Sequence, residues 1–175
     1  MTAGREEDAA VVWNVPARRK IGLLRGHTGP VHSVKFLPGT RRPVTASGDR
    51  SLRVWDADSQ QELFRIDHGA IHPRSLAVSP DGQLIALATG AGTGAKVRIW
   101  SVQSREEVWE VPAHNRANGL AFSPDGKRLA AAAGHDLIRI WDVATREMVQ
   151  AYPVVPIAAP HVAYNPDGTR IAAVS

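Results

Sequence analysis

Short runs of alternating apolar and polar residues, separated by turn signals, make up most of the chain. The run at 52–55 is typical, because large or β-branched side chains alternate there with a charged one, and this period of two predicts a strand. The clearest turn signals are Ser79-Pro80-Asp81-Gly82 and its copies at 123–126 and 165–168. Pro presets φ for a turn and Gly supplies a positive φ. The pattern predicts an all-β chain.

The predicted strands follow a repeating order of inner, second, third and outer strand, which indicates four-stranded antiparallel units. We expect three complete units, at about 31–66, 74–111 and 117–152. Two further strands at about 10–25 match only the third and outer positions, and two at 160–175 match only the inner and second positions. Residues 1–9 form a polar N-terminal tail.

Four tryptophans mark the repeat, each at the end of a third-strand run: Trp13, Trp55, Trp100 and Trp141, at intervals of 42, 45 and 41 residues. Self-similarity at about 40 residues indicates an array of one structural unit. A single unit cannot bury both of its apolar faces, so neighbouring units must stack on one another. An immunoglobulin-like sandwich does not explain this period.

The motifs around these tryptophans resemble the WD-repeat β-propeller family from about residue 10 onward. Gly26-His27 precedes an inner strand and Trp55-Asp56 closes a third one, as in the family's signature. Ala113-His114 with Trp141-Asp142 is similar, and the Ser-Pro-Asp-Gly turns resemble those of bacterial members. The resemblance implies a β-propeller, here with three complete blades and two half blades.

Family members usually carry about seven blades, so the resemblance implies that the chain is part of a larger seven- or eight-bladed ring. Two other arrangements stay open. The half blades could close a four-bladed ring as one hybrid blade, or two chains could form one ring. In the second arrangement the open blade edges would pair between chains, so self-association through these edges is possible.

The resemblance also implies a structural tetrad, namely His27, Ser47, Asp49 and Trp55. In this network Asp49 forms a hydrogen bond with His27, and His27 forms one with a strand hydroxyl. The same hydroxyl forms a hydrogen bond with the indole N–H of Trp55. Thr45 shares a strand face with Ser47, so the residue that supplies the hydroxyl is open. The third unit carries His135 in place of the aspartate, and an insertion removes the aspartate from the second unit. Only the first complete unit keeps the network.

The same residues invite a hydrolase hypothesis, because Ser, His and Asp can form a nucleophilic triad. No Gly-x-Ser-x-Gly turn exposes a nucleophile, so we favour the structural interpretation. The glycine-rich run at 90–96 joins two strands and lacks the phosphate-loop spacing and helix. No histidine pair has metal-ligand spacing. We therefore expect no catalytic, cofactor-binding or metal-binding residues, and no enzyme.

Aligning the repeats places His32, Arg74 and Asn118 at equivalent positions near the starts of the inner strands. We expect them at a rim that contacts a protein or peptide partner. The resemblance implies a non-catalytic interaction scaffold, either alone or as the sensory or docking part of a larger bacterial protein. The alternatives are a propeller enzyme with a site in its channel and a nucleic-acid-binding propeller.

Composition adds limits to this picture. The net charge is only +4, from 21 basic and 17 acidic residues, so nucleic acid is not an expected partner. The chain has no cysteine, which excludes disulfides and thiolate metal sites. No apolar run approaches the roughly 20 residues of a membrane helix, and the N-terminus is not a signal peptide. We expect a cytoplasmic protein that does not contact a membrane.

Overall fold

The computed structural model describes residues 8–69, 73–89, 94–113, 117–133, 137–153 and 161–174. These residues form sixteen strands and no α-helix, so none of them belongs to a helix that could cross a membrane. The expected all-β fold of propeller blades is confirmed. The tail expected at 1–9 lies outside the described residues except for its last two.

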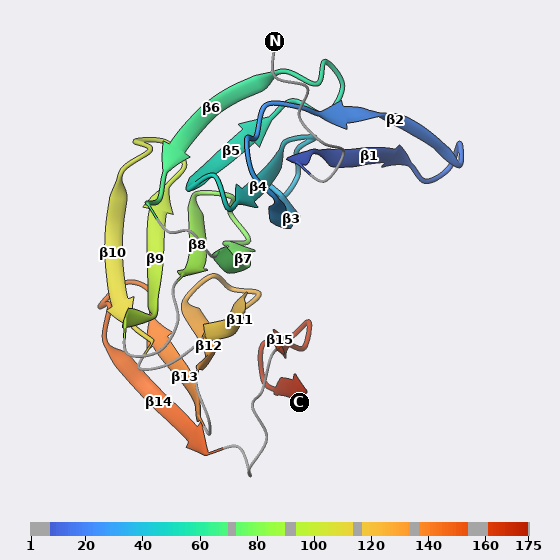
Figure 1. The fold of residues 1–175 in the computed structure, drawn as a ribbon. Helices are drawn as coiled ribbons and strands as arrows, with labels where there is room; N and C mark the ends of the chain where they lie inside the picture. The colour runs from blue at the N-terminus through green and yellow to red at the C-terminus, as the bar shows by residue number, and fades with distance from the viewer. Residues whose placement is uncertain are drawn as a thin grey trace. The chain divides into compact units, whose positions relative to one another are not determined.

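The strands appear in chain order in Figure 1. Their bounds are β1 Ala10–Asn14, β2 Arg19–Leu24, β3 Val31–Phe36, β4 Pro43–Ser47, β5 Ser51–Trp55, β6 Glu62–Asp67, β7 Pro73–Val78, β8 Leu84–Thr89, β9 Lys96–Ser101, β10 Glu107–Pro112, β11 Ala117–Phe122, β12 Arg128–Ala133, β13 Leu137–Asp142, β14 Met148–Pro153, β15 His161–Tyr164 and β16 Ile171–Val174.

Strands that follow one another in the chain pair with one another. Three sheets have four strands each, in the orders β3-β4-β5-β6, β7-β8-β9-β10 and β11-β12-β13-β14. Two sheets have two strands each, β1-β2 and β15-β16. The chain divides into two compact units at the start of β7, unit 1 being residues 1–73 and unit 2 residues 74–175.

The Pro-Asp-Gly segments form tight turns between inner and second strands. Gly82 has a φ of 71° and donates its N–H to the carbonyl of Ser79 at 2.8 Å. Gly126 and Gly168 adopt the same left-handed conformation, at 72° and 73°. A side chain at such a φ is strained, which explains the glycine in every copy.

The residue after each repeat tryptophan organises the turn to the outer strand. In this position Asp56 Oδ1 accepts the backbone N–H groups of Asp58 at 3.1 Å and Ser59 at 2.8 Å. Asp142 does the same for Ala144 and Thr145, at 3.0 and 2.9 Å. The aspartate of the Trp-Asp motif is therefore a local turn acceptor.

In unit 1, the β1-β2 sheet packs on the third strand of the next sheet. Val12 and Leu24 form an apolar cluster there with Trp55 and Ala57, and all four side chains are buried. One face of the β1-β2 sheet is thereby anchored within unit 1.

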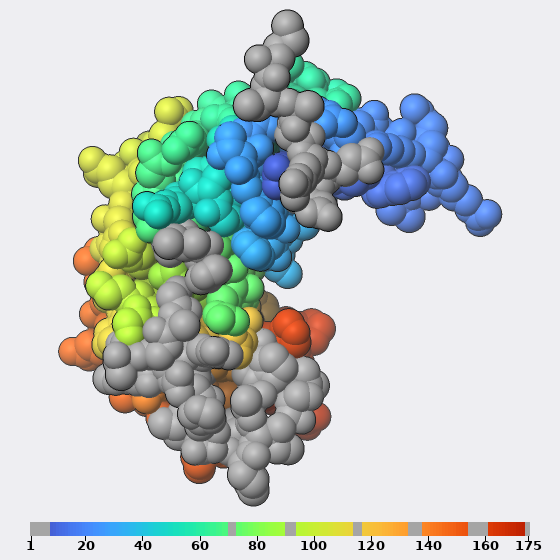
Figure 2. Space-filling view, in the orientation of Figure 1, coloured from blue at the N-terminus to red at the C-terminus, as the bar shows by residue number. Residues whose placement is uncertain are grey.

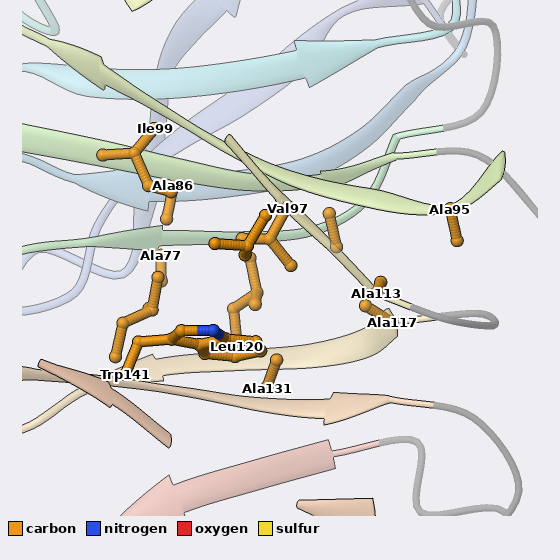
Figure 3. Close-up of a cluster of buried hydrophobic side chains, with 13 residues drawn as sticks. Ala77, Ala86, Ala95, Val97, Ile99, Ala113, Ala117, Leu120, Ala131 and Trp141 are labelled. Atoms are coloured by element: carbon orange, nitrogen blue, oxygen red, sulfur yellow. The ribbon is translucent and has the colours of Figure 1, made fainter. Parts of the chain in front are cut away.

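In unit 2, the second strand β12 contributes side chains to two apolar cores, one on each face of its sheet. Ala131 belongs to a core with Val97, Ile99 and Trp141 (Figure 3). Ala130 and Ala132, which point to the other face, belong to a second core with residues of β13 and β15. Both faces of this sheet are covered, as stacked blades require.

The inner strands of unit 2 approach one another closely. The backbone N–H of Leu120 in β11 donates to Ser75 Oγ in β7 at 3.1 Å. On the other side, a Cβ at Gly119 would lie 2.7 Å from the Cα of His161 in β15. Only glycine permits this distance, so β11 needs it to lie against β15.

Candidate functional site

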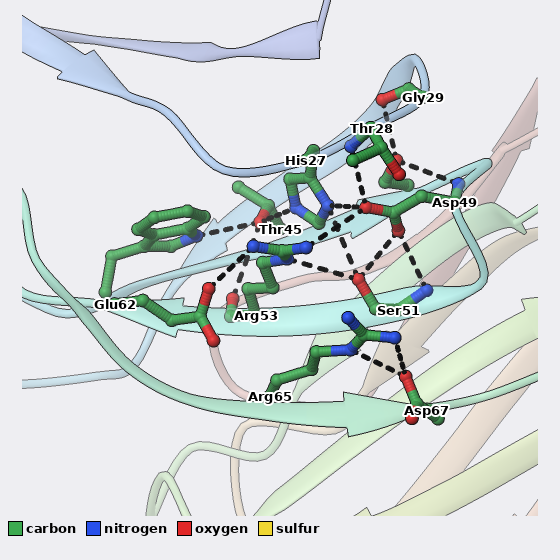
Figure 4. A network of polar contacts seen from close by, with 12 residues as sticks. His27, Thr28, Gly29, Thr45, Asp49, Ser51, Arg53, Glu62, Arg65 and Asp67 are labelled. Atoms are coloured by element: carbon green, nitrogen blue, oxygen red, sulfur yellow. Dashed lines mark hydrogen bonds and ion pairs between the residues drawn. The ribbon is translucent and has the colours of Figure 1, made fainter. Parts of the chain in front are cut away.

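A continuous chain of hydrogen bonds links four side chains of the first four-stranded sheet (Figure 4). Asp49 Oδ2 lies 2.7 Å from Nδ1 of His27. His27 Nε2 lies 2.7 Å from Oγ1 of Thr45, which also accepts the indole N–H of Trp55 at 2.9 Å. The His27 ring meets the Trp55 ring edge-on, with centroids 5.9 Å apart. The chain joins the loop before β3 to β4 and β5.

Thr45, not Ser47, supplies the strand hydroxyl, so the choice that the sequence left open falls to Thr45 and Ser47 does not belong to the expected tetrad. Ser47 Oγ donates instead to the carbonyl of Gly29 at 2.8 Å and accepts the N–H of Asp49 at 3.1 Å. The strand register gives the reason. Val44 of β4 pairs with Val54 of the antiparallel strand β5, so Trp55 lies level with the residue before Val44. Thr45 is therefore the nearer of the two hydroxyl residues to Trp55. Ser47 is two residues farther along β4, at about 3.3 Å per residue.

Arg53 extends the network in a way that the sequence analysis missed. Its side chain is buried and its guanidinium lies 2.7 Å from Oε2 of Glu62 and 3.4 Å from Oδ2 of Asp49. Its Nε donates to Ser51 Oγ at 3.3 Å, and its guanidinium carbon lies 6.0 Å from the Trp55 ring centroid. A buried arginine needs such partners, since an unpaired charge is costly there.

A signal for this extension was present in the sequence. An arginine stands two residues before Trp55, Trp100 and Trp141, within runs that are otherwise apolar. Arg53 donates to Glu62, a diagonal neighbour on the outer strand, since the register pairs Arg53 with Arg65 and Glu62 with Trp55. Arg98 donates at 2.8 Å to Glu110, which lies directly opposite it. Opposite charges on neighbouring strands form pairs.

The network favours one set of protonation states. Burial lowers the pKa of His27, although its hydrogen bond to Asp49 opposes this shift. Burial alone would raise the pKa of Asp49, but hydrogen bonds from Ser51, His27 and the Thr28 backbone outweigh it and leave that pKa below its usual range. An ionised Asp49 thus accepts Nδ1–H of a neutral His27, whose Nε2 accepts the Thr45 hydroxyl.

This arrangement is unsuited to nucleophilic chemistry. Thr45 and Trp55 are fully buried, and the threonine oxygen already accepts the indole N–H. A nucleophile must reach a substrate carbonyl from an accessible position. The described geometry is that of a structural network which ties three segments of one sheet together.

In unit 2, apolar residues occupy the position of Thr45. The register that pairs Thr45 with Arg53 pairs Leu87 with Arg98 and Ala131 with Arg139. Leu87 and Ala131 are both fully buried. His135 and most of the glycine-rich run, whose roles the sequence analysis weighed, lie outside the described residues.

The three predicted rim residues each stand second in an inner strand. His32 follows Val31 in β3, Arg74 follows Pro73 in β7, and Asn118 follows Ala117 in β11. His32 and Arg74 are exposed and Asn118 is half-buried. In β3, Val31 pairs with Ser47 and Ser33 with Ala46, so His32 is an unpaired bulge residue.

Asn118 is a bulge residue as well. Ala117 pairs with Ala133 and Gly119 with Ala132, which leaves Asn118 without an opposite residue on β12. A β-bulge turns a side chain away from the regular alternation of the strand. The sequence alignment found the positions, but it contained no signal for the bulges.

Unit 2 also has an open cleft of about 600 Å³ between two Pro-Asp-Gly turns and the turn after β13. Three carboxylates line it, those of Asp81, Asp125 and Asp142, together with Lys127. Each carboxylate accepts backbone N–H groups of its own turn. Their place in the turns accounts for them, and no group of three or more metal-ligating side chains occurs among the described residues.

Two family models match the chain. The model "WD domain, G-beta repeat" matches residues 18–56, which include the His27 to Trp55 network. The model "Anaphase-promoting complex subunit 4 WD40 domain" matches residues 76–165, about half of the chain. The chain belongs to the WD40 repeat family. Repeats of this family typically mediate protein–protein interaction or scaffolding.

Curated WD40 relatives come from several eukaryotes. "Small ribosomal subunit protein RACK1y" of Oryza sativa subsp. japonica is 31% identical over 74% of this chain and 38% of its own length. "WD repeat-containing protein 26 homolog" of Arabidopsis thaliana is 27% identical over 81% of this chain and 24% of its own. "Guanine nucleotide-binding protein subunit beta" of Oryza sativa subsp. indica is 28% identical over 82% and 38%. The chain thus spans 24% to 38% of the length of these relatives.

Proposed function

We propose that the chain is a non-catalytic scaffold that docks a protein or peptide partner at the starts of its inner strands. The observation that carries the proposal is the bulge at His32 and Asn118. Two separate sheets displace the same residue position from their ladders, and Arg74 holds the equivalent place in β7. Bulges that re-aim side chains are common where a sheet meets a ligand.

The geometry of unit 2 brings two of these positions to neighbouring strands. The Leu120 to Ser75 hydrogen bond joins β11 to β7 just beside Asn118 and Arg74. Together, the guanidinium of Arg74 and the amide of Asn118 offer several donors and one acceptor. Such a pair suits a polar or acidic peptide segment, with Arg74 supplying the charge.

The wider setting is part of the same proposal. The scaffold acts in the cytoplasm as the docking or sensory part of a larger bacterial protein. Three Pro-Asp-Gly turns support the bacterial origin, although the named relatives are eukaryotic. A chain without cysteine needs no oxidising compartment, and its modest net charge favours a protein partner over nucleic acid.

A peptide library displayed on phage tests the docking site. Peptides selected on the immobilised chain are measured by fluorescence anisotropy against Arg74→Ala, Asn118→Ala and His32→Ala. We expect Arg74→Ala and Asn118→Ala each to weaken binding about 5- to 30-fold, which corresponds to about 1–2 kcal/mol. The matched controls Arg65→Ala in β6 and Gln150→Ala in β14, both exposed, should bind within about twofold of the native chain.

Selected peptides that bind all three rim variants as tightly as the native chain would contradict the proposal. Binding of a labelled single-stranded oligonucleotide that disappears at high salt would instead support the nucleic-acid alternative. Urea denaturation of each variant verifies that the fold is kept.

A further inference from the structure

The open cleft of about 600 Å³ in unit 2 has an apolar lining as well as a charged one. Pro80, Gly126, Val143 and Ala144 supply the apolar part. Two contacts hold the turns around it together. A Cβ added at Gly126 would lie 3.6 Å from Cδ of Pro80, and the N–H of Val143 donates to the carbonyl of Lys127 at 2.8 Å. The cleft is therefore preformed, and its volume lies within the roughly 300–1,000 Å³ of ligand sites.

Unit 1 shows why this place is open in unit 2. In unit 1 the N–H of Ala57 donates to the carbonyl of Arg41 at 3.0 Å, and this bond corresponds to the one that ends on Lys127. The side chain of Arg41 crosses to the next turn and bonds Asp58 at 2.9 Å. Ala144 stands where Asp58 does, three residues after the repeat tryptophan. Unit 2 therefore lacks the arginine–aspartate pair that bridges the two turns in unit 1.

Each aspartate of the cleft keeps one carboxylate oxygen for a ligand. All the hydrogen bonds that the turns donate to Asp81, Asp125 and Asp142 end on Oδ1, so Oδ2 accepts none from the described residues. These bonds hold all three pKa values below the usual range, chiefly through a serine hydroxyl at Asp81 and Asp125 and a backbone N–H at Asp142. Three negative charges thus line the cleft at neutral pH, against one positive charge on Lys127.

The charge of the cleft is opposite in sign to the net charge of the chain, which is +4. At long range the chain repels a cationic ligand, so a local group of carboxylates must attract one. Guanidinium groups pair with carboxylates, and apolar side chains bury surface against proline, valine and alanine. We propose that this cleft docks a peptide segment of a partner protein in which arginine or lysine alternates with apolar residues.

The cleft is a second docking surface, separate from the rim of the proposed function. Arg74 and Asn118 stand near the starts of β7 and β11, whereas turns of the cleft follow the ends of these strands. A strand of six residues is about 20 Å long, so two short peptides can bind without touching. Residues 144–150 are exposed, and Figure 2 shows β14 and the turn before it, in orange, at the outer border of unit 2. The peptide reaches the cleft from solvent.

A labelled peptide tests the cleft on the full chain, by fluorescence anisotropy with a fluorescein-labelled octapeptide of alternating arginine and leucine. We expect Asp125→Asn and Asp142→Asn each to weaken binding about 3- to 10-fold, because each removes one charge. Asparagine keeps the turn, since Asn14, in the position of Asp142, accepts a turn N–H at 2.8 Å. The matched controls Asp167→Asn and Asp56→Asn alter the same turn positions outside the cleft and should bind within about twofold of the native chain.

The sign of two further changes separates a basic peptide from an acidic one. Lys127→Gln removes the positive charge of the cleft and should tighten binding about 2- to 3-fold, whereas an acidic ligand would bind less tightly. Ala144→Arg places a cation in the cleft and should weaken binding at least about tenfold. A peptide with glycine in place of leucine should bind at least about fivefold more weakly, because it buries no apolar side chain.

Amide chemical shifts in NMR spectra locate the bound peptide, and we expect shifts at the N–H groups of Gly126, Lys127 and Ala144. Arg74→Ala tests the rim and should leave binding of this peptide unchanged, so the two docking surfaces succeed or fail separately. The cleft proposal is overturned if the native chain does not bind the peptide at about 1 mM. Equal binding by Asp125→Asn and the native chain, equal binding of the glycine peptide, or weaker binding by Lys127→Gln would also overturn it.

Discussion

The replacement Thr45→Val decides which hydroxyl the buried network uses. Valine keeps the shape of threonine but removes the oxygen that bonds His27 and Trp55. Ser47→Ala removes the other candidate oxygen, whose partners are backbone groups of Gly29 and Asp49. The two variants therefore separate the interior network from the loop contacts beside it.

The structure sets the expected magnitudes. Thr45→Val leaves the indole N–H and His27 Nε2 buried without a partner, and each unpaired group costs about 1–3 kcal/mol. Because valine buries slightly more apolar surface, we expect a loss of about 2–4 kcal/mol in the free energy of unfolding. Gly29 is only half-buried, so water can replace Ser47 there. Ser47→Ala should cost about 0.5–1.5 kcal/mol.

Urea denaturation followed by circular dichroism measures both losses, provided that the slope of the transition stays constant. Thr45→Ser is the matched control, because it keeps the hydroxyl and removes only a methyl group, which costs about 1 kcal/mol. The assignment fails if Ser47→Ala destabilises as much as Thr45→Val, or if Thr45→Ser destabilises as much as Thr45→Val.

Two further outcomes follow from the geometry. Burial lowers the pKa of His27 in the folded chain, so as the pH falls the unfolded chain, with a pKa of about 6.5, binds the proton first. The free energy of unfolding should therefore fall between pH 7 and pH 5. Urea denaturation at both pH values should show a smaller fall in His27→Gln. Asp49, with its pKa lowered, keeps its contribution above about pH 3.9 and does not add to this change. Gly119→Ala should lower the unfolding free energy by about 1–3 kcal/mol because β11 must move from His161, whereas Gly94→Ala, with open space around it, should change it little.

Much of this fold could be predicted because its signals are local. Each strand carries its own alternation, and each Pro-Asp-Gly turn carries its own chemistry, so the strands and their grouping into sheets follow from the sequence. His27 and Asp49 could be named because the WD-repeat resemblance implies a buried network at these positions before Trp55. Their hydrogen-bond geometry comes from the structure.

Period-two reasoning could not separate Thr45 from Ser47, because both side chains point to one face of β4. The separation depends on the register between β4 and β5, which is a property of two strands together. The same holds for the bulges at His32 and Asn118, where the inner strand has one residue more than its partner. Alternation can be seen within the sequence of one strand, whereas the pairing register depends on two strands together.

The two hydroxyls of β4 connect the buried network to the rim. The buried hydroxyl of Thr45 bonds His27. Ser47 donates to the carbonyl of Gly29, and Asp49 Oδ2 accepts the N–H of Thr28 at 3.1 Å. These bonds hold Thr28 and Gly29 in the loop that leads into β3, and Gly29 lies three residues before His32. Unit 2 places Leu87 and Ala131 where unit 1 has Thr45, so packing alone suffices for the sheet. The polar network is therefore best explained by the loop that it orders. Under the proposed function, a rigid loop before His32 would lower the entropy that this residue loses when a partner binds.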